Sequence, residues 1–346
     1  MSKKITLQKL KTIGSNFRMS KINPLSNSHL FKRKKINHPE QNNLETKIAI
    51  KIPAGSWKTV HEWGDYHFAL ALKKEFEKKG YGVLLQILPE WDNGEDSNCE
   101  VIIVLRGLSR YTPKKNHFNI MWNISHPDKV KTEEYNQYDY VLIASEIWAR
   151  NIKELVDVPV EAMLQCTDPE LFYPDFSEEY EHELLFVGNS RKVFRKIIKD
   201  LLPTDKDLSI YGTNWKNLID NKYIKGEHIP NKELRKAYSS CKILLNDHWD
   251  DMREKGFISN RLFDGFAAGA FIISDKINGA SDIFGNALIT YDTSDELAIL
   301  IYKYLDNEIE RKEISKDCQS FVIKQHTFQN RVERMLEIIN SNKMMQ

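Results

Sequence analysis

The chain has 346 residues, of which 41% are hydrophobic and 29% are charged, and its formal net charge is +1. These values are typical of a soluble globular protein with two domains of ordinary size. It contains no apolar run of about 18 residues that could span a membrane, and its N-terminus lacks the apolar core of a secretory signal. Four scattered cysteines (Cys99, Cys166, Cys241 and Cys318) form no CxxC pair, which favours buried thiols in a reducing cytosol.

Residues 1–45 are strongly basic. They contain ten Lys or Arg residues and two Glu residues, so they carry a formal charge of +8 and the remaining chain carries −7. A basic arm ahead of an acidic body argues against a nucleic-acid-binding protein. We interpret the arm as a partly disordered extension. A second interpretation is a weak peripheral contact with an anionic membrane surface, led by Phe31–Lys35.

The first predicted unit alternates strands and helices. A strand at Lys47–Ile52 precedes a helix at Tyr66–Lys79, which Gly80 ends. Several of the strands are apolar almost throughout, which is typical of a parallel sheet covered on both faces. The further strands are predicted at Tyr81–Leu88, Glu100–Leu105, Phe118–Ile124 and Tyr140–Ala144. We assign residues 46–165 to this N-terminal, acceptor-side domain.

The second predicted unit has the same alternation, and we assign residues 166–325 to it, with a C-terminal helix over residues 326–346. A basic helix should follow Gly188-Asn189-Ser190 and run through Leu202. Strands are predicted at Glu183–Val187, Ser209–Tyr211, Lys242–Asn246, Ala270–Ser274 and Ala287–Tyr291. Helices are predicted at Lys232–Ser239, Asn260–Ala268, Ser294–Tyr304, Glu308–Gln319 and Thr327–Asn340. Two doubly wound α/β domains make the cleft between them the natural ligand site.

The stretch from Asn260 to Asp275 carries the clearest chemical signal. A polar segment meets the start of a predicted helix there, and the free N–H groups of a helix start suit a diphosphate. Ser259 and Asn260 are also good N-cap residues, which is the structural alternative. Asp264 lies one turn into the helix, where a carboxylate could accept hydrogen bonds from both ribose hydroxyls. A solvated acid on the helix face is the alternative for Asp264.

Three motifs in order resemble the "glycosyl transferases group 1" families. They are Leu244–Asp275 with its Asn260-Arg261-Leu262-Phe263-Asp264 core, the crossover Thr167–Pro174, and Leu185–Ser190. The first motif is most similar to that of the CgeB-like branch. This resemblance implies a GT-B fold of two doubly wound Rossmann-like domains that face a central cleft, with a C-terminal helix crossing back. It also implies a metal-independent glycosyltransferase.

One position departs from the pattern of the retaining GT-B enzymes. Their motif places two Glu residues eight positions apart, whereas this chain has Lys255 in the region of the first and Asp264 at the second. The first acid is therefore replaced by Lys255 or displaced to Glu254. The resemblance supports the ribose role of Asp264 but leaves retention or inversion open.

The donor site is expected to use two further groups of residues. Diphosphate contacts are predicted from Gly188, Asn189, Arg191, Lys192, Arg195, Phe257, Ser259, Asn260 and Arg261. Contacts with the nucleobase are predicted near Tyr211, Gly212 and His228. No Asp-x-Asp motif is suitably placed at a strand end, so neither a metal nor another cofactor is expected. The donor itself is a nucleotide-diphosphate sugar.

Proton removal from the acceptor hydroxyl needs a carboxylate or an imidazole. Asp65, His61 and His126 are the candidates, because they lie in loops that follow predicted strands. Asp65 could instead cap a helix, and His126 could stabilise a turn before Pro127.

We therefore predict a bacterial, cytoplasmic enzyme of polysaccharide biosynthesis, at the inner face of the plasma membrane if the basic arm binds there. The acceptor is expected to be a glycan, lipid-linked glycan or other surface polysaccharide. The alternatives are a catalytically inactive GT-B scaffold that partners another glycosyltransferase, and a sugar-nucleotide epimerase. The base, the sugar and the oligomeric state stay open.

Overall fold

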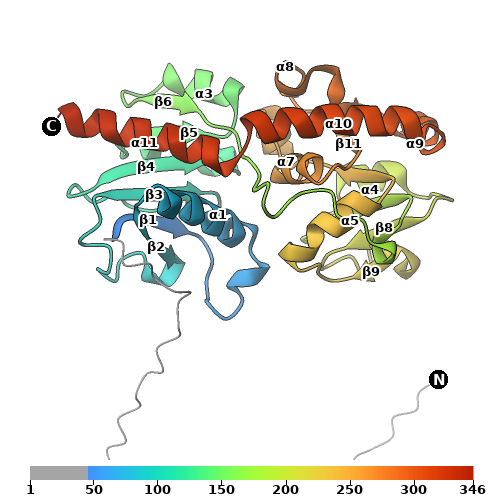
Figure 1. Cartoon of the computed structure of the whole chain (residues 1–346), viewed down its shortest axis with the longest axis horizontal. Helices are drawn as coiled ribbons and strands as arrows, with labels where there is room; N and C mark the ends of the chain where they lie inside the picture. The colour runs from blue at the N-terminus through green and yellow to red at the C-terminus, as the bar shows by residue number, and fades with distance from the viewer. Residues whose placement is uncertain (1–45, 346) are drawn as a thin grey trace, which may run out of the picture. The chain divides into compact units, whose positions relative to one another are not determined.

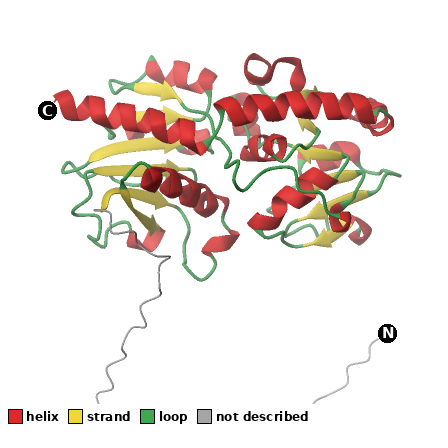
Figure 2. Cartoon of the chain, viewed as in Figure 1, coloured by secondary structure: helices red, strands yellow, loops and turns green. Residues whose placement is uncertain are grey.

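The computed structural model describes residues 46–345, which contain two six-stranded parallel sheets (Figure 1, Figure 2). The basic arm at residues 1–45, and with it the predicted membrane contact, lies outside the described residues. Helices or short 3-10 turns separate consecutive strands of each sheet, as the alternation in the sequence predicts, except between β3 and β4, which a loop connects.

The first sheet has the strand order β2-β1-β3-β4-β5-β6. Its strands are β1 (Thr46–Ile52), β2 (Gly82–Ile87), β3 (Val101–Arg106), β4 (Phe118–Asn123), β5 (Tyr140–Ile143) and β6 (Val160–Ala162). Its helical segments are η1 (Val60–Glu62), α1 (Gly64–Lys78), η2 (Leu88–Glu90), η3 (Pro127–Lys129), α2 (Thr132–Tyr135) and α3 (Glu146–Lys153). The order reverses between β1 and β3, and a doubly wound sheet binds its ligand at such a switch point.

The second sheet has the strand order β12-β11-β10-β7-β8-β9, and its order reverses between β7 and β10. Its strands are β7 (Leu184–Val187), β8 (Leu208–Tyr211), β9 (Ile224–Gly226), β10 (Ile243–Asn246), β11 (Ile272–Asp275) and β12 (Ile289–Tyr291). Its helices are α4 (Lys196–Leu201), α5 (Leu234–Ser240), α6 (Asp250–Glu254), α7 (Asn260–Ala267), α8 (Ala280–Phe284), α9 (Ser294–Asp306) and α10 (Glu308–Gln325). Four 3-10 turns complete it: η4 (Glu178–Tyr180), η5 (Asn221–Tyr223), η6 (Asn231–Glu233) and η7 (Gly285–Ala287).

The apolar strand residues are buried on both faces of each sheet. All six residues of β3 are buried, and apolar clusters lie on either side of each sheet. Val, Ile and Leu dominate these strands because a parallel sheet covered by helices exposes neither face to water. The sheets are therefore rigid supports for the loops at the carboxyl ends of their strands.

The last helix, α11 (Phe328–Met345), belongs to the core of the first sheet. Phe328, Val332 and Met335 are buried in the same apolar cluster as Phe68 of α1. The helices α11 and α1 pack against each other on the same sheet (Figure 1). The chain therefore returns to its first half after completing its second, as expected. At the return, the backbone of Thr167 pairs with His326 and Phe328 through hydrogen bonds of 2.9 and 3.1 Å.

The structure confirms the strands predicted from apolar runs and corrects the start of one helix. The basic helix was expected directly after Ser190, but α4 begins only at Lys196. Arg191 and Lys192 have φ angles of 53° and 64°, which no α-helix accommodates. The short strands β6 and β9 and the helices α2, α3, α6 and α8 were not predicted.

We expect Phe328→Ala to lower the free energy of unfolding by about 3–4 kcal/mol, because it empties a buried ring site. The Phe328 side chain is 5% exposed, and its ring lies 4.6 Å from that of Phe68. Urea denaturation measures the change. Gln329→Ala, on the exposed side of the same turn, is the control and should alter stability by no more than about 0.5 kcal/mol. Equal stability of both variants would contradict the assignment of α11 to the first core.

Candidate active site

A cavity of about 260 Å³ lies where the switch-point loops of both sheets meet. From the first half it is lined by Asp65, Ile124, Ser125, His126 and Gln165. From the second half it is lined by Gly188, Asn189, Arg191, Arg195, Asp247, His248, Trp249, Met252, Ser259, Asn260 and Arg261. Of the predicted donor contacts, this cavity brings together Gly188, Asn189, Arg191, Arg195, Ser259, Asn260 and Arg261.

The start of α7 is held by a buried histidine. Ser259 is the N-cap residue, but its hydroxyl makes no capping bond; its backbone N–H instead donates to Nε2 of His248 at 3.0 Å. Nδ1 of His248 lies 2.7 Å from Oδ1 of Asp275, and the backbone N–H of His248 donates to Oδ2 at 3.1 Å. Because Nε2 accepts a hydrogen bond, Nδ1 carries the proton and donates it to Asp275. This chain of bonds fixes where the first turn of α7 points.

Arg261, in that first turn, is held without a carboxylate partner. Its Nη1 donates to Oδ1 of Asn246 at 2.7 Å, and its guanidinium lies 5.2 Å from the Phe186 ring centroid. A Cβ at Gly188 would come within 2.9 Å of its Nη2, so the glycine permits this close approach. Burial lowers the pKa of Arg261, yet a guanidinium stays protonated. Arg261 thus supplies a cation beside the cavity that no acid among the described residues neutralises within ion-pair distance.

The loop after β7 supplies two more arginines with different roles. Arg195 is buried and forms an ion pair with Asp247, whose backbone carbonyl it also contacts at 3.2 Å. Its charge is therefore balanced within the protein. Arg191 is exposed, lies 5.5 Å from the Trp249 ring centroid, and has no ion-pair partner among the described residues. A dianionic ligand would find Arg191 and Arg261 available, whereas Arg195 orients the loop.

Two of the three predicted proton acceptors line the cavity. Asp65 lies in the first turn of α1, where burial raises the pKa of its carboxyl to about 6 against the opposing charge of Arg191. The Nδ1 of His126 lies 3.9 Å from Oδ2 of Asp251, and burial lowers the pKa of the imidazole. His61 is exposed and does not line the cavity. Asp65 caps no helix, since Trp63 is the N-cap of α1.

Asp264 is bound to the crossover between the halves. Its Oδ1 accepts from the Thr167 hydroxyl at 2.7 Å, and its Oδ2 accepts from the Asn260 amide at 2.7 Å. Burial raises its pKa to about 8, although these two hydrogen bonds act in the opposite direction. Asp264 lies one turn behind the cavity and does not line it. Its contacts exclude the alternative of a solvated acid on the helix face.

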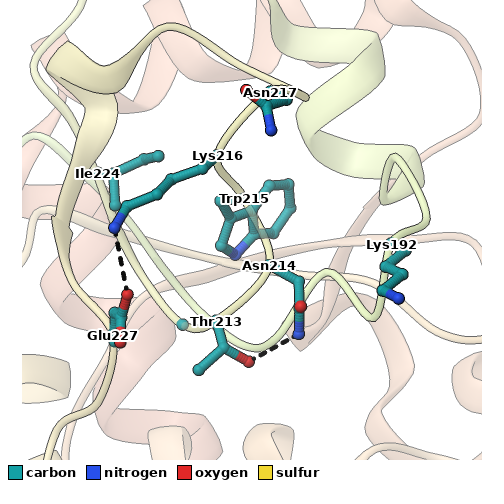
Figure 3. A pocket seen from close by; sticks show the side chains of 9 residues that line it. Lys192, Thr213, Asn214, Trp215, Lys216, Asn217, Ile224 and Glu227 are labelled. Carbon is teal, nitrogen blue, oxygen red and sulfur yellow. Dashed lines mark hydrogen bonds and ion pairs between the residues drawn. The ribbon is translucent and has the colours of Figure 1, made fainter. Parts of the chain in front are cut away.

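A second cavity, of about 580 Å³, lies at the carboxyl ends of β8 and β9 (Figure 3). Its wall includes Lys192 and Gly212 of the predicted donor contacts, but neither Tyr211 nor His228. Trp215 is 1% exposed, and its Nε1 donates to the Gly188 carbonyl at 2.8 Å, which links this wall to the first cavity. The residues predicted around the nucleobase are therefore divided between this cavity and the surface beside it.

The predicted contact at Phe257 has a structural role. The ring is 0% exposed and packs in an apolar cluster of the first half together with Met252. Glu254 is exposed and lines neither cavity, and Lys255 lines neither one. The region of the missing first acid thus places no carboxylate in the cavity.

Several lining residues were not predicted as donor contacts. Asp247, His248 and Trp249 follow β10 directly, so their position after a strand was a signal that could have identified them. Gln165 lies in the crossover, and its Nε2 donates to the Ile124 carbonyl at 2.8 Å. Nothing in the local pattern distinguished Gln165.

The arrangement of two doubly wound parallel sheets, with a last helix that returns to the first, is the GT-B glycosyltransferase fold. The chain is similar to sucrose-phosphate synthase from Thermosynechococcus elongatus, with a TM-score of 0.68 and 10% identity over 87% of this chain and 100% of that one. It is similar to a glycosyltransferase from Rickettsia africae, with a TM-score of 0.59 and 13% identity over 85% and 97%. T4 phage BGT, solved with its UDP-glucose substrate, gives a TM-score of 0.58 and 16% identity over 84% and 98%.

The sequence comparison supports the same class over part of the chain. Residues 190–337 match the model of a family described as "Glycosyl transferase-like". No curated protein matches the chain in sequence. The match covers the loop with Arg191 and Arg195, the start of α7, and more than half of α11, the helix that returns to the first half. The similarity to this family therefore lies in the second half and in the helix that returns to the first.

Residues 46–345 contain no group of three or more His, Cys, Asp or Glu side chains placed to hold a metal ion. Among their helices, none is long and apolar enough to cross a membrane.

The raised pKa of Asp264 predicts a pH-dependent stability. The carboxyl binds its proton with a pKa of about 8 when folded and about 3.9 when unfolded. The folded state therefore holds more protons between these values, and the free energy of unfolding falls as the pH rises from about 4 to about 8. We expect Asp264→Asn to reduce this fall by on the order of 2 kcal/mol.

Denaturant titrations at pH 5, 6.5 and 8 measure the effect. The asparagine can be accommodated because Oδ1 of Asn260 is buried without a partner, so that amide can turn to accept from the new one. Asp282→Asn, at an exposed position, is the control. Parallel pH profiles for the wild type and Asp264→Asn would contradict the assigned shift.

Proposed function

We propose that this protein is a glycosyltransferase that moves a sugar from a nucleotide-diphosphate-sugar donor to a glycan acceptor without a metal ion. The observation that carries the proposal is the convergence of two uncompensated arginines, Arg191 and Arg261, with the start of α7 on one cavity. Asp65 lines the same cavity from the first half.

The arginines and the helix start suit the diphosphate. The leaving nucleotide gains negative charge as the bond to the sugar breaks, and fixed cations and N–H groups stabilise that charge. Arg195 is already paired with Asp247, so it positions the loop while Arg191 and Arg261 bind the phosphates. A metal ion is not required for this charge balance, because the two guanidiniums match the two charges of the diphosphate.

Asp264 is proposed to accept hydrogen bonds from the ribose hydroxyls. Each of its oxygens accepts one hydrogen bond in the structure, and in the ionised form, which prevails above its pKa of about 8, each has a further lone pair available. The nucleobase would then lie toward Tyr211, Gly212 and His228. The solved neighbour with UDP-glucose makes uridine diphosphate the first nucleotide to test.

Asp65 is the proposed catalytic base. It accepts the proton of the acceptor hydroxyl while that oxygen forms a bond with the anomeric carbon and the bond from that carbon to the diphosphate breaks. A carboxyl whose pKa is about 6 is largely ionised at neutral pH and still accepts a proton readily. His126 lies on the same side of the cavity and is proposed to orient the acceptor.

The acceptor and the cellular setting are proposed from the sequence resemblance. We propose a surface polysaccharide or lipid-linked glycan acceptor, a bacterial enzyme of the CgeB-like branch, and a cytoplasmic location. The basic arm would give weak contact with an anionic membrane. Two solved neighbours are glucosyltransferases that were crystallised with DNA or modify it, and at 11–14% identity they support the fold alone.

The alternative is a catalytically inactive scaffold that partners another glycosyltransferase. The scaffold is favoured by Lys255, which stands where the retaining enzymes have their first acid. It is disfavoured by Asp65, whose carboxylate lines the cavity and is available as a base. Such a scaffold would bind nucleotide without turnover. A sugar-nucleotide epimerase is less well supported, because the cavity presents only one carboxylate that is not held in an ion pair.

Nucleotide binding provides the first test. In EDTA, we expect one of uridine, guanosine or thymidine diphosphate to raise the melting temperature. Arg261→Met should lower the affinity for that nucleotide about 10- to 100-fold, because it removes a charged hydrogen-bond donor to the phosphates. Asp264→Asn should also weaken binding of that nucleotide, because it changes the proposed acceptor of the ribose hydroxyls.

Lys199→Ala is the matched control, since that lysine is exposed on α4 away from both cavities. Failure of every nucleotide to stabilise the protein would refute the proposal. Binding that appears only after a divalent metal is added would refute the metal-independent part.

Turnover tests the base. With the nucleotide sugar selected by the binding assay, Asp65→Asn should lower kcat by about 10²–10⁴-fold while the affinity for the donor stays within twofold. The wild-type rate should fall as the pH drops below about 6, because protonated Asp65 cannot accept a proton. If the wild type binds the nucleotide but neither hydrolyses the nucleotide sugar nor transfers the sugar to a glycan or lipid-linked glycan, the result favours the scaffold.

A further inference from the structure

Residues 249–257 of the second half are inserted into the first half. Met252 and Phe257 are 7% and 0% exposed and belong to the same apolar cluster as Met121 and Ile143 of the first sheet. This segment runs from the cavity wall to the position where the resembling enzymes have their first acid. The two halves are therefore in apolar contact beside the cavity.

Polar contacts at Lys255 reinforce this insertion. The hydroxyl of Ser145 donates to the carbonyl of Lys255 at 2.5 Å and also accepts from the backbone N–H of Trp148 at 3.0 Å as the N-cap of α3. The same serine thus begins a helix of the first half and holds the backbone of the second. A hydrogen bond of this kind fixes the direction in which the Lys255 side chain leaves the segment.

The ammonium of Lys255 points at the first half. It forms an ion pair with Asp128 and lies 4.8 Å from the ring centroid of Trp148. His126, two residues before Asp128, faces Asp251 at 3.9 Å across the same contact. The Lys255–Asp128 ion pair and the approach of the His126 imidazole to Asp251 therefore join the loop at residues 124–130 to residues 249–257.

The contact leaves no room for added atoms. A Cβ at Gly256 would lie 3.1 Å from Oγ of Ser145, and a Cβ at Gly279 would lie 2.8 Å from Cδ1 of Ile147, both in the first half. Both glycines have φ angles above 70°, in a region that favours glycine. The close approach of the two halves here is built into the backbone.

We propose that Lys255 is a positioning residue, which clamps the loop at residues 124–130 to residues 249–257 and so fixes His126 relative to the start of α7. Its consequence for sugar transfer rests on the proposed function, whereas the clamp itself does not. The proposal also accounts for the departure from the retaining motif. A carboxylate at this position would face Asp128 and repel it, so the acid is replaced by a cation that holds the cavity wall together.

Spin labels across the halves test the clamp. Glu154→Cys and Ser320→Cys place labels at exposed sites in α3's C-cap and in α10, while the four native cysteines are at most 8% exposed and stay unlabelled. The full chain should give one narrow distance distribution. Lys255→Ala should broaden it, and Lys255→Glu should broaden it further because Glu would face Asp128 and Asp251. The pair Lys255→Glu with Asp128→Lys should restore the narrow distribution.

Lys276→Ala is the matched control, because Lys276 pairs with Asp292 at 2.7 Å within the second half. It should leave the distance distribution unchanged. Asp128→Asn, a conservative change at an exposed position, keeps the test available if a Lys255 variant folds poorly. Distributions identical to the wild type in Lys255→Ala, Lys255→Glu and Asp128→Asn would overturn the proposal.

Kinetics separate the clamp from the proposed function. With the selected donor, Lys255→Ala should lower kcat about tenfold, the effect of losing an ion pair and a cation–π contact, and leave KM for the donor within twofold. If the wild type binds nucleotide but the Lys255 and Asp128 variants have the same label distances as the wild type, the clamp alone is refuted. Label distances that respond in a protein that binds no nucleotide would refute the proposed function alone.

Discussion

The hydrogen bonds from Asp275 through His248 to the N–H of Ser259 are the interaction on which the candidate site depends. Asp275 ends β11 and His248 follows β10, so two neighbouring strands fix one imidazole. That imidazole accepts from the first turn of α7, which carries Asn260, Arg261 and Asp264. Because Asp275 and His248 are buried, losing either would leave a polar group without a partner, and a buried unpaired group costs about 1–3 kcal/mol. The position of the proposed donor contacts is thus set by the sheet.

The charge balance of the cavity follows from the same loops. Three arginines approach it, and one of them, Arg195, is neutralised by Asp247. The excess positive charge is left on Arg191 and Arg261, next to a helix start that also favours anions. Asp65 is the acid that approaches from the first half, and the charge of Arg191 limits how far burial raises its pKa. A surface built in this way is suited to the proposed diphosphate and to an ionised Asp65 close to it.

Local patterns in the sequence predicted most of the fold, because buried parallel strands are apolar on both faces. The strands β6 and β9 were missed because each has only three residues with a charged one in the middle (Glu161 and Lys225), so neither forms an apolar run. The fold class and the carboxyl-end loops followed from the alternation of strands and helices. The predicted donor contacts at Gly188, Arg191 and Arg261 followed from motif order, and these three residues line one cavity.

The remaining features of the site depend on contacts between distant residues. His248 and Asp275 are 27 positions apart, and Arg195 and Asp247 are 52 apart, so no local pattern reveals that they pair. The same is true of Phe257, which the motif suggested as a donor contact. Its ring is drawn into the apolar core of the first half instead. Tertiary packing decided these positions.

The return of α11 has a consequence for how the protein is made. The core of the first sheet includes Phe328, Val332, Met335 and Ile339, which are synthesised after every residue of the second sheet. Domains generally fold as units during translation, in the order in which they emerge from the ribosome. Here the second half can complete its sheet first, while the half translated earliest waits for the last helix. The nascent first half therefore leaves part of its apolar core uncovered until α11 has been translated.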